Sequence, residues 1–169
     1  NALYSNDDTN FNTAIGNYAL EFQNEGGRNI AVGYQALNAD TKGARSVAIG
    51  WGALATQNFT SVTITGNTAV GYAAGNAVTT GTNNTLIGSL AGDALTTGSS
   101  NVAVGQGAFG ANTTGSANVA VGTNALDAST TSLNNTAVGH VSLGATTTGA
   151  NNTGVGAYVM QANTTGANN

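Results

Sequence analysis

The stretch NVAVGQGAFGANTTGSA, residues 101–117, decides the fold, because most of the chain is this stretch written again with small changes. A pentapeptide of the type Asn-x-Ala-Val-Gly recurs, and its last glycine returns at intervals of 17, 17, 21, 17, 17, 17, 17 and 17 residues. These glycines are Gly16, Gly33, Gly50, Gly71, Gly88, Gly105, Gly122, Gly139 and Gly156. A short fixed period is the sequence signature of a solenoid, in which each repeat forms one coil and successive coils stack.

The repeats organise the whole chain into one array. We number the positions of each repeat from 1 to 17, and the complete repeats cover residues 12–28, 29–45, 46–66, 67–83, 84–100, 101–117, 118–134, 135–151 and 152–168. Repeat 46–66 carries four extra residues, which we expect in a surface turn or a small β excursion. Residues 1–11 match the end of an earlier repeat and Asn169 matches the start of another. We therefore expect a single β-roll over residues 1–169, as a segment of a longer fibre.

The residue types at positions 1–5 indicate an extended strand. Position 2 is always β-branched and position 4 is always Val or Ile, whereas positions 3 and 5 are almost always Ala and Gly. β-branched residues two apart share one face of a strand and suit a helix poorly. We predict an all-β parallel β-roll (β-solenoid) of about ten coils, with a second short strand at positions 7–10. A disordered linker would have no reason to keep this phase. The predicted repeat core is Ile15, Val32, Ile49, Val70, Ile87, Val104, Val121, Val138 and Val155.

The two faces of this strand lead to a prediction about assembly. If Val or Ile and the large residue at position 9 fill the coil, the flat Ala/Gly face lies outside and suits tight packing against another chain. The predicted homo-oligomer interface is Ala31, Gly33, Ala48, Gly50, Ala103, Gly105, Ala120 and Gly122. The opposite arrangement, with Ala and Gly inside, stays open and would leave Val and Ile exposed.

Position 6 carries aromatic residues in three consecutive repeats. These are Tyr34, Trp51 and Tyr72, and Phe59 lies nearby in the insertion. Stacked coils would place these rings in one exposed ladder, which suits stacking on sugar rings or docking of a protein partner. The alternative is that such a ladder only stabilises the array.

The composition gives no support for catalysis, a cofactor or a metal site. Only 6% of residues are charged and the net charge is -4, so nucleic acid is a poor partner. The sequence has no Cys, so thiol chemistry is absent. The single histidine, His140, takes the variable position 6 and is expected to be exposed. The segment Gly105–Gly110 matches G-x-G-x-x-G, but a turn sequence follows it instead of a helix. Acidic residues recur at position 10, as Glu21, Asp93 and Asp127, in repeats that are not adjacent. No apolar run is long enough for direct membrane insertion.

The segments SVAIG (46–50), NIAVGYQAL (29–37) and NTTG (112–115) resemble repeats of two families. They are similar to the head repeats of YadA-like trimeric autotransporter adhesins and to repeats of phage-tail-fibre-like proteins. The resemblance implies a left-handed β-roll, a side-by-side homotrimer, an extracellular place on a cell surface or virion, and a role in attachment. From the aromatic ladder, the partner that we expect besides the chain itself is a cell-surface glycan or protein receptor. Two other functions remain open. An ice-binding or purely structural solenoid would use ladders of Thr and Asn, and a glycan depolymerase would need clustered acids.

Overall fold

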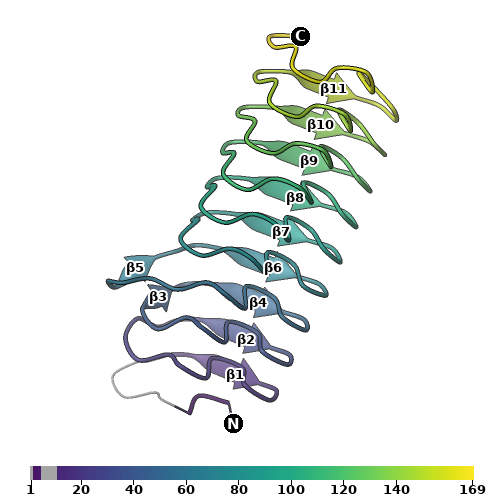
Figure 1. The fold of residues 1–169 in the computed structure, drawn as a ribbon. Helices are drawn as coiled ribbons and strands as arrows, with labels where there is room; N and C mark the ends of the chain where they lie inside the picture. Colours follow the sequence, from purple (N-terminus) through teal and green to yellow (C-terminus); the bar gives the residue numbers. More distant parts are fainter. Residues whose placement is uncertain (1, 5–10) are drawn as a thin grey trace.

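Positions 2–4 of every complete repeat form a three-residue strand. The computed structural model describes residues 2–4 and 11–169, and these strands stack along a rod with the two chain ends at opposite ends (Figure 1). The strands are β1 (Thr13–Ile15), β2 (Ile30–Val32), β4 (Val47–Ile49), β6 (Thr68–Val70), β7 (Thr85–Ile87), β8 (Val102–Val104), β9 (Val119–Val121), β10 (Thr136–Val138) and β11 (Thr153–Val155).

Within the described residues these strands make one nine-stranded sheet, which we call the long sheet. Every neighbouring pair is parallel, and equal repeat positions face each other, as in Ala103 opposite Ala120. The predicted all-β parallel β-solenoid of 17-residue coils is therefore confirmed, with nine strands in the long sheet where about ten coils were expected.

The four extra residues of repeat 46–66 form a β excursion on one side of the rod. Strand β5 (Thr63–Ile64) pairs in parallel with β3 (Gly43–Ala44) of the preceding coil. The two short strands lie on one side of the rod, β3 level with β4 and β5 level with β6 (Figure 1). The insertion thus extends one turn and leaves the register of the long sheet unchanged.

The predicted second strand at positions 7–10 is wrong, because those residues form turns. Positions 7 and 9 have positive φ in every complete repeat, including bulky residues such as Leu37 (51°) and Leu126 (51°). This conformation is unfavourable for residues with a side chain. It is retained because the turned amides bond to the next coil: the Leu37 N–H donates to the Ala53 carbonyl over 3.0 Å.

The predicted repeat core is also wrong, because the small face of the strand points inward. Ala31, Ala48, Ala103 and Ala120 at position 3 are fully buried, whereas Ile49 and its equivalents at position 4 lie on the outer face. The residues that fill the coil beside the alanines are those at positions 8 and 9, including Leu37, Leu54, Phe109 and Leu126. Position 12 adds a second row of buried side chains, such as Gln57 beside Leu54 and Leu95 beside Leu86, which further limits the space inside the coil. Position 3 must therefore be small.

One exception shows how tightly positions 3 and 9 are coupled. Leu86 replaces Ala at position 3, and the position 9 residues beside it are Gly75 and Gly92. A Cβ on Gly75 would stand 2.6 Å from Cδ1 of Leu86, and one on Gly92 would stand 2.8 Å from Cδ2. The leucine therefore occupies the volume that the two glycines leave, which keeps the interior filled.

Buried asparagines at position 1 connect each coil to the next. Asn118 is typical: its backbone N–H donates to Oδ1 of Asn101 over 3.0 Å, and its Nδ2 donates to the Ser132 carbonyl over 2.9 Å. The same two bonds recur in most other coils. Each asparagine thus closes its own coil and holds the coil that follows, and we call this row the asparagine ladder.

We predict that Asn135→Ala destabilises the rod strongly. The change removes the acceptor of the Asn152 N–H (2.8 Å) and the donor to the Gly149 carbonyl (2.8 Å), and it leaves both groups buried. Each unsatisfied buried group costs about 1–3 kcal/mol. Thermal unfolding followed by circular dichroism measures the loss. Asn134→Ala is the matched control, because Asn134 is exposed and Ala117 holds the equivalent position in the preceding coil. Equal losses in both variants would contradict a special role for the ladder.

Candidate functional site

The outer face of the long sheet is a flat surface of β-branched side chains. Positions 2 and 4 both point outward, so each strand adds two such residues, and the pairing aligns them into two rows along the rod. Ile30, Ile49 and Ile87 keep 38–40% of their surface exposed, and the end residues Ile15 and Val155 keep 61% and 68%. Large apolar patches of this kind mark interaction sites.

The predicted Ala/Gly interface is contradicted by the same inversion of faces. Ala31, Ala48, Ala103 and Ala120 are buried inside their own coils, so another chain cannot reach them. Packing within the chain itself requires glycine at the other predicted interface positions, Gly33, Gly50, Gly105 and Gly122. Gly105, for example, has φ 135°, and a Cβ there would stand 2.6 Å from the carbonyl carbon of Gly122 in the next coil.

The aromatic ladder is present as an exposed stack. The rings of Tyr34 and Trp51 lie 5.9 Å apart with an interplanar angle of 17°, and those of Trp51 and Tyr72 lie 5.1 Å apart at 16°. The three side chains are 40%, 46% and 54% exposed. Tyr18, which the sequence analysis did not include because it sits at position 7, extends the stack with an edge contact of 5.9 Å to Tyr34. The rings form one continuous surface that would suit planar or apolar ligand groups.

Phe59 does not belong to this surface, which corrects the sequence-based prediction. Its side chain is only 8% exposed, whereas Val62 and Ile64 of the same insertion are each 59% exposed. Phe59 packs inward where the insertion leaves the coil. The pairing of β5 with β3 decides which apolar residues of the insertion face solvent.

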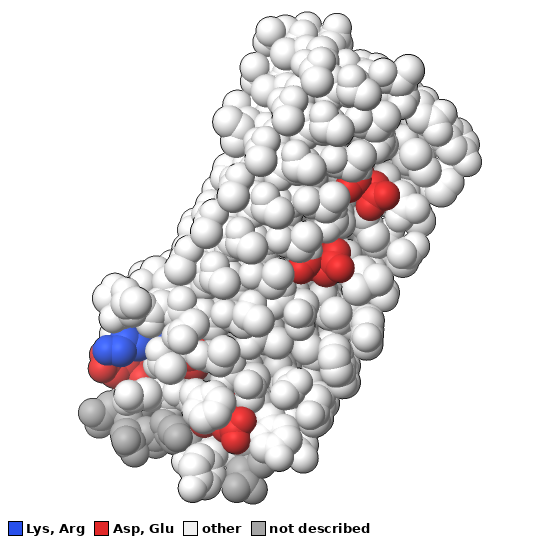
Figure 2. Space-filling model, viewed as in Figure 1, with Lys and Arg blue, Asp and Glu red and all other residues white. Residues whose placement is uncertain are grey.

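Two of the position 10 acids approach each other across a glycine. A Cβ on Gly110 would stand 3.1 Å from Oδ1 of Asp127 and 3.5 Å from Oδ1 of Asp93, so both carboxyls reach over the intervening coil. Partial burial raises the pKa of both groups above the ordinary range, and the charge of Asp127 raises that of Asp93 further. Glu21 lies apart and accepts a bond from Asn38. Figure 2 shows acidic side chains in small separate patches on a face that is otherwise largely uncharged.

The other sequence candidates occupy ordinary places in the repeat. His140 is exposed, as predicted, and its ring meets that of Tyr158 edge-on at 5.1 Å. Residues 105–110 form the turn after β8, with Phe109 buried in the coil. Across residues 2–4 and 11–169, no group of three His, Asp or Glu side chains is placed to hold a metal ion. The same residues contain no helix long and apolar enough to cross a membrane.

Asp40 is a carboxyl group inside the coil. It is fully buried at position 12, where its Oδ1 accepts from the Gly43 N–H (2.8 Å) and its Oδ2 accepts from Nε2 of Gln57 (2.6 Å). Burial raises its pKa above the ordinary value near 3.8, and the bonds from Gln57 and the backbone lower it by less. In a later coil Asn112 makes the corresponding bond to the Gly115 N–H over 2.7 Å.

Comparison with known proteins does not identify a relative: no family model, curated protein or solved structure matches the chain. The surfaces of the rod are therefore the observations on which a function is proposed.

We predict that Trp51→Ala weakens retention on immobilised saccharides by tenfold or more and changes the melting temperature by no more than a few degrees. The reason is that the side chain is half exposed, and a stacked ring pair contributes only about 0.5–1.5 kcal/mol. Retention on an array of immobilised saccharides measures the binding, and thermal unfolding measures the melting temperature. Gln106→Ala, at the same repeat position, is the matched control. A lower melting temperature with unchanged retention would show that the ladder only stabilises the rod.

We predict that Asp40→Asn makes the melting temperature less dependent on pH between pH 4 and pH 7. A carboxyl group whose pKa is higher in the fold favours folding when protonated. This contribution is complete below the unfolded value near 3.8 and is lost as the pH rises through the folded value. Unfolding measured at both pH values tests this. Glu21→Gln removes a charge from a partly exposed site and serves as control. Asp93 and Asp127 keep their own contributions, so the test is the difference between variants: an equal pH dependence in Asp40→Asn and the unchanged chain would contradict the prediction.

Proposed function

We propose that this chain is a structural and adhesive segment of a trimeric surface fibre, such as a phage tail fibre or a bacterial adhesin, that mediates attachment to a host or a surface. The observation that carries the proposal is the outer face of the long sheet, where two rows of β-branched residues are partly or fully exposed along the rod. Water-exposed apolar surface of this extent is stabilised when another protein surface covers it.

The occupant that fits this face best is a second and third copy of the same chain. All copies carry the same 17-residue spacing, so rows on neighbouring rods would match along their whole length. Closed cyclic assembly of identical chains satisfies such a face without leaving a free surface. The number three and an extracellular place follow from the resemblance to adhesin heads and tail fibres described above.

The adhesive part of the proposal rests on the aromatic stack of Tyr18, Tyr34, Trp51 and Tyr72. These residues follow the strand at positions 6 and 7, outside the three strand positions that form the flat face. A stiff trimer would present three such stacks, and several weak contacts on one rod add up to firm attachment. The ligand class that suits the rings is a glycan or a protein surface, and we propose no catalytic step.

An ice-binding solenoid is the second candidate, and one observation favours it. Thr13, Thr68, Thr85, Thr136 and Thr153 occupy position 2 on the flat face, each two residues before Val or Ile. The result is a rigid array of hydroxyl and methyl groups, with neighbouring strands about 4.8 Å apart. Such an array would order water if the face stayed uncovered.

We predict a trimer in solution that Val121→Lys converts to a folded monomer. Val121 lies on the flat face, so a trimer would bury three unpaired lysine charges near one another. Light scattering gives the mass, and circular dichroism shows that the coil remains folded. Thr123→Lys, exposed at position 6, is the control and should stay trimeric. A folded wild-type monomer would refute the fibre proposal, and thermal hysteresis of that monomer at micromolar concentration would favour ice binding.

A further inference from the structure

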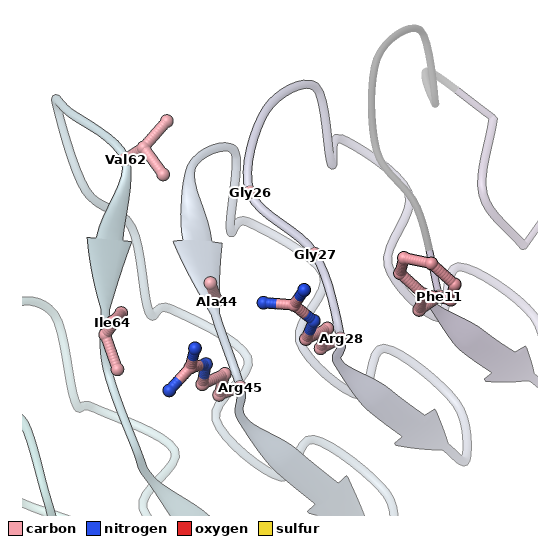
Figure 3. Close-up of a pocket in the computed structure, with 8 residues that line it drawn as sticks. All are labelled: Phe11, Gly26, Gly27, Arg28, Ala44, Arg45, Val62 and Ile64. Carbon is pink, nitrogen blue, oxygen red and sulfur yellow. The ribbon is translucent and has the colours of Figure 1, made fainter.

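A hollow of about 310 Å³ lies at the N-terminal end of the rod, beside the β3–β5 excursion. Its lining contains two guanidinium groups, from Arg28 and Arg45, and the apolar side chains of Phe11, Val62 and Ile64. Figure 3 shows the two guanidinium groups side by side in this hollow, with Phe11 on one flank and Ile64 on the other. We call it the arginine pocket.

The arginine pocket holds both arginines of the chain. The third basic residue, Lys42, donates to Oε1 of Glu25 over 2.9 Å. Within the described residues that is the one ion pair, so neither guanidinium has a carboxylate partner there. Arg28 lies 5.8 Å from the ring centre of Phe11, a contact that orients the guanidinium and leaves its N–H donors available.

The fold itself gives no reason for arginine at these two places. Arg28 and Arg45 both occupy position 17, and in-register stacking places equal positions of adjacent coils about 4.8 Å apart. Two like charges carried on neighbouring coils repel each other. Both residues also have positive φ, 61° and 65°, which suits Asn or Gly better. The later coils carry neutral residues at this position, namely Gly66, Asn83, Ser100, Ala117, Asn134, Asn151 and Asn168.

An anion held between the two guanidinium groups would turn this repulsion into binding. Arginine presents N–H donors in a planar fork that matches the two oxygens of a carboxylate. The flanking groups specify more than charge, because Phe11, Val62 and Ile64 are 80%, 59% and 59% exposed. The Gly26-Gly27 backbone also lines the pocket without side chains, so peptide groups lie within reach of ligand hydroxyls.

We propose that the arginine pocket binds the carboxylate-bearing ring of an acidic saccharide. The carboxylate would bridge Arg28 and Arg45, the carbon–hydrogen face of the ring would contact Ile64 and Val62, and ring hydroxyls would meet the glycine backbone. The volume of about 310 Å³ suits one monosaccharide unit. An acidic peptide would instead need a longer groove to hold its backbone.

This inference names a ligand class for the attachment role proposed above, on which it rests for its biological meaning. The pocket is formed by one chain, however, so its binding test does not depend on the oligomeric state. A failed titration would leave the fibre proposal intact, and a monomeric rod would leave the pocket intact.

Titration of the purified chain with sodium glucuronate, followed by NMR of the arginine side-chain N–H groups, tests the proposal. Methyl glucoside is the neutral control ligand and a short glutamate peptide is the competing class. We expect saturable shifts of Arg28 and Arg45 with glucuronate and none with methyl glucoside. Arg28→Asn and Arg45→Asn should each weaken binding about 10- to 100-fold, since each removes charged hydrogen bonds.

The variants are chosen so that the fold survives. Asparagine is the residue that the chain itself uses at position 17 with nearly the same φ, as in Asn83 (58°). Lys42→Gln removes an equal charge outside the pocket lining and should leave the glucuronate affinity within about twofold. Equal losses in Lys42→Gln and Arg45→Asn would overturn the proposal, because they would show general charge attraction. Tighter binding of the glutamate peptide than of glucuronate would overturn the saccharide assignment.

Discussion

The asparagine ladder is the interaction on which the rest of the rod depends. Each ladder amide accepts a hydrogen bond from the coil that follows and donates one across its own coil. Oδ1 of Asn101, for example, accepts from the Asn118 N–H, and Nδ2 of Asn101 donates to the Gly115 carbonyl. Equal positions must therefore stack above one another, and they recur every 17 residues except across repeat 46–66, where four more residues form a longer turn. The exception supports this account. Ser46 replaces asparagine in the coil with the insertion, and Gln57 bonds both Ser46 (3.1 Å) and Asn67 (2.8 Å), which restores the connection.

In-register stacking also explains the low charge of the chain. Each residue has as its neighbour, about 4.8 Å away, the residue at the same position of the next coil. Amides, hydroxyls and flat rings gain from this neighbour, as Tyr34, Trp51 and Tyr72 do in their stack. Like charges on neighbouring coils repel each other, which is consistent with the low share of charged residues, 6%. The paired Arg28 and Arg45 depart from that pattern, and Asp93 and Asp127 are separated by Gly110.

The narrow interior determines which surface the rod offers to partners. Residues at positions 9 and 12, together with mostly small residues at positions 3 and 8, fill the coil, so the β-branched residues of the strands have no room inside. They become two partly exposed rows along the rod instead of a core. A solenoid of this kind therefore combines a small, well-filled interior with an apolar outer face, which is the form expected of a unit in a larger assembly.

The sequence by itself determined the period, the parallel in-register stacking, the strand at positions 2–4 and the stacked rings of Tyr34, Trp51 and Tyr72. A repeat with alternating residue types fixes these, because periodicity is a local property. It could not decide which face points inward, since alternation is symmetric between the two faces. The pairing of Leu86 with Gly75 and Gly92 was the one signal of the true arrangement, because compensating sizes indicate a shared interior. Only the tertiary structure decided that Phe59 is buried, that the arginines share a pocket and that positions 7–10 turn. These features depend on how neighbouring coils pack and form hydrogen bonds. The positive φ of a bulky residue such as Leu37 cannot be predicted from its residue type.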